Sequence, residues 1–274
     1  MKILLAPFVY DVGYDVVFDL AATRLRELQH DVVVSAEELT SHELERFDLL
    51  ISNKAANQVV RDSVPTIAGI ATPRATELRL LQEHDIPTMD WRLVPRRLDL
   101  INAFIHWKTF RILLKRSFTS GGAGVTAFSP WHFANIKYNK NHDLVCRIVN
   151  PHDGDIWKAE LFDGELLISW VSRSKPVSLL PHLKLQTGID GAYGDRERIA
   201  FPASLIKRLA DMSKSLTDRG MGQVSFDFMR DKDGEFNAIE FNSCFPAMWW
   251  TSQFDDFRSA FVESVVRVVE KRSL

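Results

Sequence analysis

The stretch QVSFDFMRDKDGEFNAIEFNSCFP, residues 223–246, decides the fold. Two runs of alternating polar and apolar residues flank Asp231-Lys232-Asp233-Gly234, a composition typical of a tight turn between antiparallel strands. Side chains along a strand point to opposite faces in turn, so Asp227, Glu240 and Asn242 share one face and phenylalanines dominate the other. The pattern predicts a hairpin with a core face and an acidic face.

The register of this hairpin controls how close its carboxylates come to each other. A tight turn pairs Arg230 with Glu235 and sets Asp227 opposite Ala238. Glu240 then lies diagonal to Asp227, about 7–8 Å away between backbones, which is too far for direct contact. A divalent cation is expected to bridge the two carboxylates. A slip of one residue in this register would turn the side chains of one strand to the other face.

A magnesium site is the chemistry that the acidic face favours. Mg²⁺ prefers one or two carboxylates together with phosphate oxygens and water, and Asp227, Glu240 and Asn242 offer such donors. Mn²⁺ would suit the same ligands. The neighbours expected on this face, which indicate a cleft, are Met229, Phe236 and Ala238. The alternative is a solvated sheet face, on which acidic residues are common.

A second stretch, RILLKRSFTSGGAGV at residues 111–125, puts Lys115 in an apolar strand just before a glycine-rich loop. A lysine beside such a loop can set its ammonium against a phosphate while backbone N–H groups bind other phosphate oxygens. No Gly-Lys-Ser/Thr follows the loop, so it is not a P-loop. A flexible hairpin turn beside an edge-strand lysine has the same sequence pattern.

The composition is that of an ordinary globular protein. Lys plus Arg is 34 against 36 for Asp plus Glu, a formal net charge of −2, so no nucleic-acid partner is expected. Cys146 and Cys244 are far apart in sequence, which argues against a disulfide framework or a zinc knuckle and favours the cytoplasm. Pro7, Asp11 and Asp15 interrupt the first apolar run, so we expect neither a signal peptide nor a membrane span.

The chain divides into a parallel N-terminal part and a longer antiparallel part. Short strands expected at 3–6, 32–34 and 49–52 alternate with helices, which predicts a small βαβ sheet. Thr72 and Pro73 then begin a helix to residue 84, as N-cap and first helical residue.

Further strands are expected at 111–118, 124–128, 143–150, 155–162 and 165–172, and helices at 96–107, 202–219 and 255–271. The expected domains are 1–90 and 91–274, the latter with lobes at 91–150 and 151–274.

Four motifs in sequence order carry a family resemblance. They are RATELRLLQEHDIPTM (74–89), ILLKRSFTSGGAGV (112–125), GDIWKAELFDGELL (154–167) and SFDFMRDKDGEFNAIEFNSCFP (225–246). This set resembles the ATP-grasp superfamily, in particular its glutathione synthetase-like and ribosomal-protein glutamate ligase-like branch. The resemblance implies an α/β (α+β) ATP-grasp fold, in which a βαβ lobe precedes antiparallel nucleotide-binding lobes.

The resemblance also implies which residues bind the nucleotide. Lys115 would contact the α- and β-phosphates, and Arg74 stands where the family usually has a nucleotide-binding lysine. The phosphate loop would be formed by Ser120, Gly121, Gly122 and Gly124. The remaining expected contacts are Arg147 and Ile148 of the adenine hinge, at residues 145–149, and Asp155.

Catalysis is assigned by the resemblance to Lys115 and Arg173. Arg173 matches an arginine that faces the transferring phosphoryl group in relatives, where positioning and electrostatics supply the catalysis. The alternative is a surface arginine at the end of a strand. Trp157 stands where relatives have a substrate- or phosphate-directed arginine, and Lys158 is expected on the opposite face of the strand.

The activity that the resemblance implies is that of an Mg-ATP-dependent carboxylate–amine ligase. Such an enzyme forms an amide or peptide bond through an acyl phosphate and releases ADP. Its substrate would be a small amino acid, a peptide or a protein terminus, and a homodimer is one assembly that the resemblance allows. Two alternatives stay open: an ATP-binding regulatory module without ligase activity, and a kinase of a small carboxylate or hydroxyl substrate.

Overall fold

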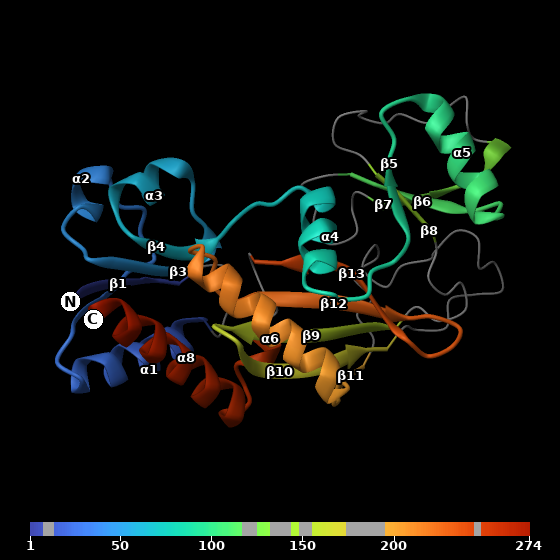
Figure 1. The fold of residues 1–274 in the computed structure, drawn as a ribbon. Coiled ribbons are helices and arrows are strands. Elements are labelled where there is room, and N and C mark those ends of the chain that lie inside the picture. Colours follow the sequence, from blue (N-terminus) through green and yellow to red (C-terminus); the bar gives the residue numbers. More distant parts are fainter. Residues whose placement is uncertain (8–13, 117–124, 132–143, 148–154, 174–194, 244–247) are drawn as a thin grey trace.

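The computed structural model describes residues 1–7, 14–116, 125–131, 144–147, 155–173, 195–243 and 248–274 (Figure 1). Within these ranges the strands form three sheets, one parallel and two antiparallel, and helices lie against their faces. This arrangement confirms the predicted α/β fold with antiparallel sheets after a parallel N-terminal part. Of the helices in the described part of the chain, none is both long and apolar enough to cross a membrane.

The N-terminal sheet is parallel and has the strand order β2-β1-β3-β4. Its strands are β1 (Lys2–Ala6), β2 (Asp31–Val34), β3 (Leu49–Ala55) and β4 (Thr66–Gly69), and its helices are α1 (Tyr14–Glu27), α2 (Ser41–Leu44) and α3 (Gln58–Ser63). The sequence predicted the first three strands but not β4 or α3. Asn57 begins α3, because its side-chain oxygen accepts a hydrogen bond from the backbone N–H of Val60.

A small antiparallel sheet follows, in the order β5-β8-β6-β7. Its strands are β5 (Trp91–Leu93), β6 (Ile112–Lys115), β7 (Val125–Phe128) and β8 (Leu144–Arg147). Helix α5 (Arg97–Trp107) packs on it through an apolar cluster that includes Leu100, Phe104, Ile112 and Leu114. Since Ile112 and Leu114 point to α5, Leu113 and Lys115 point to the opposite side, toward the large sheet.

The large sheet is antiparallel throughout and has the order β11-β10-β9-β12-β13. Its strands are β9 (Ile156–Phe162), β10 (Glu165–Ser172), β11 (Arg196–Arg198), β12 (Val224–Arg230) and β13 (Phe236–Asn242). The other helices are α4 (Arg74–Glu83), α6 (Ala203–Asp218), α7 (Met248–Thr251) and α8 (Asp255–Ser273). Buried residues of α6 recur three and four apart, which fixes the face that it presents to β9 and β10.

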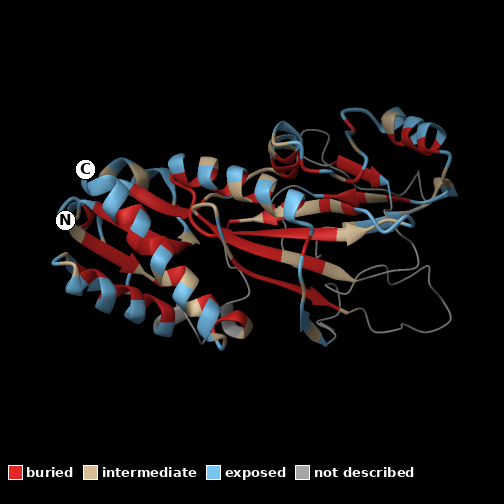
Figure 2. Ribbon diagram, turned by 60° about the horizontal axis from the view of Figure 1, so that its bottom comes forward, coloured by how far each residue is buried: buried red, intermediate tan, exposed pale blue. Residues whose placement is uncertain are grey.

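The N-terminal sheet and the large sheet share one apolar core. Residues of β1, α1, β10 and α8 pack together there, with Phe18 and Phe162 both against Phe261 of the last helix. The two ends of the chain consequently lie close together (Figure 1). Figure 2 shows that the helices turn their buried faces to the sheets and their exposed faces outward.

The β12–β13 hairpin forms as predicted, but its register differs from the expected one. Arg230 pairs with Phe236 instead of Glu235, because the turn contains one more residue. A β-bulge then follows, since Phe228 pairs with Ala238 and Asp227 with Glu240, which leaves Ile239 as the extra residue. The expected diagonal relation is wrong: the two carboxylate residues are direct cross-strand partners.

The shifted register also changes the apolar neighbours of the acidic face. Phe236 and Ala238 were expected beside the carboxylates but belong to the core on the other face. Phe236 lies 5.3 Å from the ring of Trp157 and 4.7 Å from that of Phe201 between centroids. Of the side chains that the sequence placed around a cleft, Phe236 and Ala238 therefore belong to the packing between the sheet and its helices.

Candidate functional site

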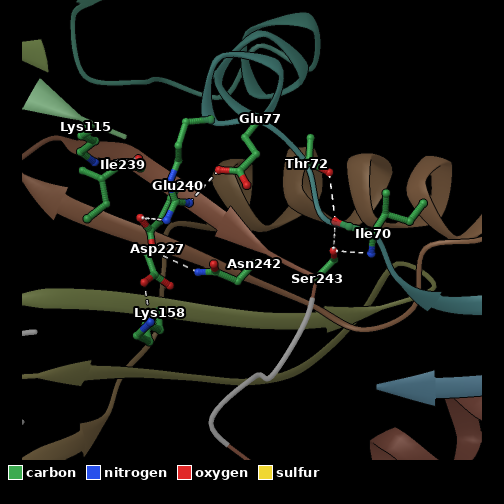
Figure 3. Close-up of polar contacts among 11 residues, drawn as sticks. Ile70, Thr72, Glu77, Lys115, Lys158, Asp227, Ile239, Glu240, Asn242 and Ser243 are labelled. Atoms are coloured by element: carbon green, nitrogen blue, oxygen red, sulfur yellow. Dashed lines mark hydrogen bonds and ion pairs between the residues drawn. The ribbon is translucent and has the colours of Figure 1, made fainter. Parts of the chain in front are cut away.

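The centre of the candidate site is the acidic face of β12 and β13 (Figure 3). Asp227 and Glu240 face each other across the two strands, so their Cβ atoms lie about 5 Å apart. The side-chain amide of Asn242 donates a hydrogen bond to Glu240 Oε1 at 3.1 Å. Two residues before Asp227 on β12, and on the same face, the Ser225 hydroxyl lies 3.4 Å from Asp227 Oδ1. The structure thus brings the three predicted metal ligands together.

Lys158 on β9 belongs to this face as well. It is the cross-strand partner of Asp227, and its ammonium contacts Asp227 Oδ2 in an ion pair whose two side chains are nearly buried. Trp157, the preceding residue, points into the core, where its indole is 6% exposed. Lys158 therefore lies on the carboxylate side of the sheet and Trp157 lies on the other side. Strand alternation predicts that the two side chains point to opposite faces, but the sequence alone did not show that Lys158 would pair with Asp227.

Arg74 reaches the site from α4, of which it is the first residue. Its Nη2 lies 2.8 Å from Glu240 Oε2 and its Nη1 lies 2.7 Å from Glu77 Oε2. The predicted cap is wrong here: Pro73 occupies the N-cap position, and the Thr72 hydroxyl donates instead to the Ile70 carbonyl. The helix consequently starts so that its first side chain lies over β13.

Glu77 is a member of the site that the sequence analysis missed. It stands one helical turn after Arg74, and both side chains are buried, at 7% and 6% exposed. An acid three residues after an arginine on a helix is the pattern that would have indicated the pair. Burial of both partners, which the pattern does not predict, is what makes the pair part of the site.

Lys115 approaches from the small sheet. Its ammonium donates a hydrogen bond to the Ile239 carbonyl at 3.2 Å, and only 4% of the residue is exposed. Ile239 is the bulged residue of β13 and has no partner in the register with β12. Its carbonyl is therefore available to accept the hydrogen bond from Lys115. This contact joins the small sheet to the large one directly beside Glu240 (Figure 3).

The site holds three cations and three carboxylates among its described residues. The pKa values of the three carboxyl groups shift in different directions. Burial raises the pKa of Asp227 despite the adjacent Lys158 ammonium. Burial also raises the pKa of Glu77 to about 7, against the opposing effect of Arg74. Burial would raise the pKa of Glu240 too, but the positive charges of Arg74 and Lys115 outweigh it, so that pKa lies below its ordinary value.

The donor set fits a hard divalent cation with few protein ligands. In the described part of the chain no group of three or more His, Cys, Asp and Glu residues is placed to hold a metal ion by itself. Asp227 and Glu240, with the amide of Asn242, instead provide two opposed carboxylates and one neutral oxygen donor. Mg²⁺ commonly takes such a set and completes its shell with phosphate oxygens and water.

The other predicted residues lie apart from this cluster or outside the described residues. Arg173 follows β10 and points to the Trp157 face; its guanidinium pairs with Asp155 at 2.9 Å and Glu197 at 2.7 Å. Arg147 ends β8 and lies 3.4 Å from the exposed Asp90 carboxylate. Five predicted residues lie outside the described residues: Ser120, Gly121, Gly122, Gly124 and Ile148.

No family model and no curated protein matches the chain. Solved structures of ATP-grasp enzymes do match it along nearly its whole length. D-cycloserine synthetase DcsG is 13% identical with a TM-score of 0.62, and the alignment covers 97% of this chain and 100% of that one. For D-alanine–D-alanine ligase from Bacillus anthracis complexed with ATP, the identity is 15%, the TM-score 0.55 and the coverage 99% of each chain.

A third similar structure is a Chryseobacterium gregarium RiPP-associated ATP-grasp ligase in complex with ADP and a leader and core peptide. It is 9% identical with a TM-score of 0.62, and the alignment covers 99% of this chain and 97% of that one. At such low identity the likeness shows the fold. The chain has the ATP-grasp fold, as its motifs predicted.

Proposed function

We propose that this protein is an Mg-ATP-dependent ligase that joins a carboxylate to an amine. The observation that carries the proposal is the direct opposition of Asp227 and Glu240 on a sheet face reached by Lys115, Arg74 and Lys158. Opposed carboxylates suit a divalent cation, and converging cations suit a triphosphate. The ATP-grasp fold supports the same conclusion, because the similar enzymes are ligases.

The existing ion pairs define how the residues would receive the nucleotide. Mg²⁺ between Asp227 and Glu240, with Asn242, would shield the γ-phosphate charge and polarise its oxygens. Lys115 would turn from the Ile239 carbonyl to the phosphates, and Arg74 would share its guanidinium between Glu240 and phosphate oxygen. The glycine loop at 121–124, which lies outside the described residues, stays a predicted contact of the triphosphate.

The proposed reaction has two steps. A carboxylate oxygen of the substrate attacks the γ-phosphorus, the bond to the bridging oxygen breaks, and ADP leaves. The amine nitrogen then attacks the acyl carbon, phosphate leaves with the former carboxylate oxygen, and the amine loses a proton. Lys158 would neutralise charge on the sheet face during both steps. A catalytic role for Arg173 stays a prediction, which requires that it exchange Asp155 or Glu197 for phosphate.

An amino acid or a peptide is the proposed substrate class. The Chryseobacterium enzyme of the same fold is complexed with a leader and core peptide, and D-alanine–D-alanine ligase is named for an amino acid. We propose that one of these classes, or a protein terminus, supplies the carboxylate in this protein as well. Action in the cytoplasm, and as a homodimer, belongs to the same proposal.

The test is ATP turnover by a Glu240→Ala variant, measured as ADP release with pools of amino acids and short peptides. The variant loses one of two metal carboxylates, so we expect turnover to fall by at least about a hundredfold. Glu235→Ala on the exposed turn of the same hairpin is the matched control and keeps its activity. ADP release by Glu240→Ala at the wild-type rate, in protein with unchanged circular dichroism, would refute the metal assignment.

A nucleotide-binding module without ligase chemistry is the second candidate. The ion pairs of Arg74 with Glu240 and of Lys158 with Asp227 favour it, since they balance the carboxylates without any metal. Both candidates bind a non-hydrolysable ATP analogue in calorimetry. Only the ligase releases ADP in response to an added carboxylate and amine, whereas a kinase would need no amine and would accumulate a phosphorylated product.

A further inference from the structure

Helix α5 is apolar on two opposite faces. Leu100, Ala103, Phe104 and Trp107 pack on the small sheet. On the outer face Leu98 is 64% exposed, Ile101 38% and Ile105 69%. These three residues are three and four positions apart, so they form one stripe about 10 Å long. Phe110, just after the helix, is 73% exposed. We call Leu98, Ile101, Ile105 and Phe110 the outer stripe.

The surroundings of the outer stripe are strongly basic. Residues 91–116, all within the described part of the chain, contain seven Lys and Arg residues and a single acid, Asp99. The chain as a whole has a net charge of −2, whereas this segment has six more basic than acidic residues. Its exposed cations are Arg92, Arg96, Arg97, Lys108, Arg111 and Arg116. Asp99, the one acid of the segment, pairs with Arg96.

We propose that the outer stripe and its basic surroundings bind an acidic, amphipathic segment of a polypeptide. The stripe would bury leucine-like side chains of the partner, and the cations would pair with its carboxylates. Exposed aliphatic residues in line on a helix mark an interaction site, because folded proteins rarely leave a contiguous apolar stripe exposed to water. Charge complementarity requires the partner to be acidic.

The composition of the surface favours a polypeptide over other polyanions. Five of its six exposed cations are arginine, which forms bidentate pairs with carboxylates and is enriched at protein interfaces, where lysine is depleted. A nucleic acid would leave the aliphatic stripe without a partner. An anionic membrane would attract lysine and arginine alike. A second copy of this chain would bring an equally basic surface against the first, which like-charge repulsion disfavours.

The test uses a labelled synthetic helix of about 16 residues, with leucines three and four apart and glutamates between them. Fluorescence anisotropy measures its binding to the full chain without ATP, so the outcome does not depend on the ligase proposal. The same residues in scrambled order form the control peptide. We expect the patterned peptide to bind at least about tenfold more tightly, and Ile105→Asp and Arg111→Glu each to weaken it about tenfold.

Val59→Asp on α3, where the valine is 59% exposed, is the matched control variant and keeps wild-type binding. Equal affinity for both peptides, or no binding of either, overturns the proposal. It is also overturned if Ile105→Asp leaves peptide binding intact but abolishes binding to phosphatidylserine vesicles or to a single-stranded RNA 20-mer. A wild-type dimer that becomes monomeric in Ile105→Asp, seen by sedimentation, would assign the stripe to a second copy instead.

Discussion

At the scale of single residues, the partly buried cations have to be understood together with the acids that they contact. Lys158 and Asp227 form an ion pair on the carboxylate side of the large sheet, with side chains 14% and 8% exposed. Lys158 also lies 5.7 Å from the ring centroid of Trp170. Removal of one partner leaves the other charge buried, whereas removal of both does not. The pair is therefore expected to be strongly coupled.

We predict that Lys158→Met lowers the free energy of unfolding by about 3 kcal/mol, because it leaves the Asp227 carboxylate without its cation. Lys158→Met combined with Asp227→Asn should cost less than the two single changes added together. Urea unfolding at pH 8 measures all four proteins of the cycle. Lys232→Met, on the exposed hairpin turn, is the control. Strictly additive effects would show that the pair is not coupled.

A second residue-scale prediction concerns Glu77, whose pKa burial raises from 4.5 to about 7. The folded protein binds this proton more tightly than the unfolded chain, so the contribution of Glu77 to stability is complete below pH 4.5 and is lost as the pH rises through 7. Glu77→Gln cannot ionise. Relative to wild type, the variant should gain up to about 3 kcal/mol between pH 5 and pH 8.

Urea unfolding at the two pH values measures that gain. Glu83→Gln, at the exposed end of the same helix, is the matched control and should show no comparable change. If Glu77→Gln has the same relative stability at both pH values, the carboxyl of Glu77 ionises normally and its burial does not govern its pKa.

At the scale of elements, a glycine with positive φ ends the last turn of α6 and allows it to approach the N-terminal sheet closely. Helix α6 ends at Asp218, and Gly220 follows its C-cap with a φ of +81°, so that the backbone N–H of Met221 returns to the Leu216 carbonyl. The Gly220 carbonyl accepts hydrogen bonds from the Ala68 N–H and from Arg61. This close approach ties the end of α6 to β4 of the N-terminal sheet.

We predict that Gly220→Ala and Gly234→Ala differ in cost, although both glycines have positive φ. A Cβ on Gly220 would lie 2.7 Å from the Thr66 carbonyl oxygen, whereas nothing lies within 4 Å of one on Gly234. Gly234→Ala should cost about 1 kcal/mol for its backbone conformation alone. Gly220→Ala should cost at least about 2 kcal/mol more, because the backbone of β4 would have to move. Equal losses in urea unfolding would contradict the close approach.

At the scale of the whole molecule, the small sheet meets the large one at the candidate site. Lys115 of β6 binds the Ile239 carbonyl of β13, and Met89 pairs through its N–H with the Ala238 carbonyl. Arg74 adds a contact from α4 to the same strand. A ligand bound among these residues would therefore contact both sheets and α4, and its binding should stabilise the molecule as a unit.

We predict that a non-hydrolysable ATP analogue with Mg²⁺ raises the free energy of unfolding by about 2.7 kcal/mol at a concentration one hundred times its Kd. Chelation of Mg²⁺ should weaken analogue binding at least about tenfold, because phosphate would then face two carboxylates without a divalent cation between them. Calorimetry measures the Kd, and Glu240→Gln should abolish the effect of Mg²⁺ while Glu235→Gln keeps it. An affinity that does not depend on Mg²⁺ would contradict the site.

Local pattern determined much of this protein by itself. Alternation in residues 224–242 was enough to predict the hairpin and to place Asp227, Glu240 and Asn242 on one face, and the sequence also predicted α5 and α6. Such periodicities arise within a few neighbouring residues, so the sequence alone contains them. The order of the motifs likewise predicted the fold that the solved structures share.

Only the tertiary structure decided which side chains meet. The bulge at Ile239 made Asp227 and Glu240 direct partners, and the pairing of β9 with β12 gave Asp227 its lysine. The packing of α4 over β13 buried Glu77 beside Arg74. Register, strand neighbours and helix packing depend on contacts between distant segments, whose free energy no local pattern in the sequence expresses.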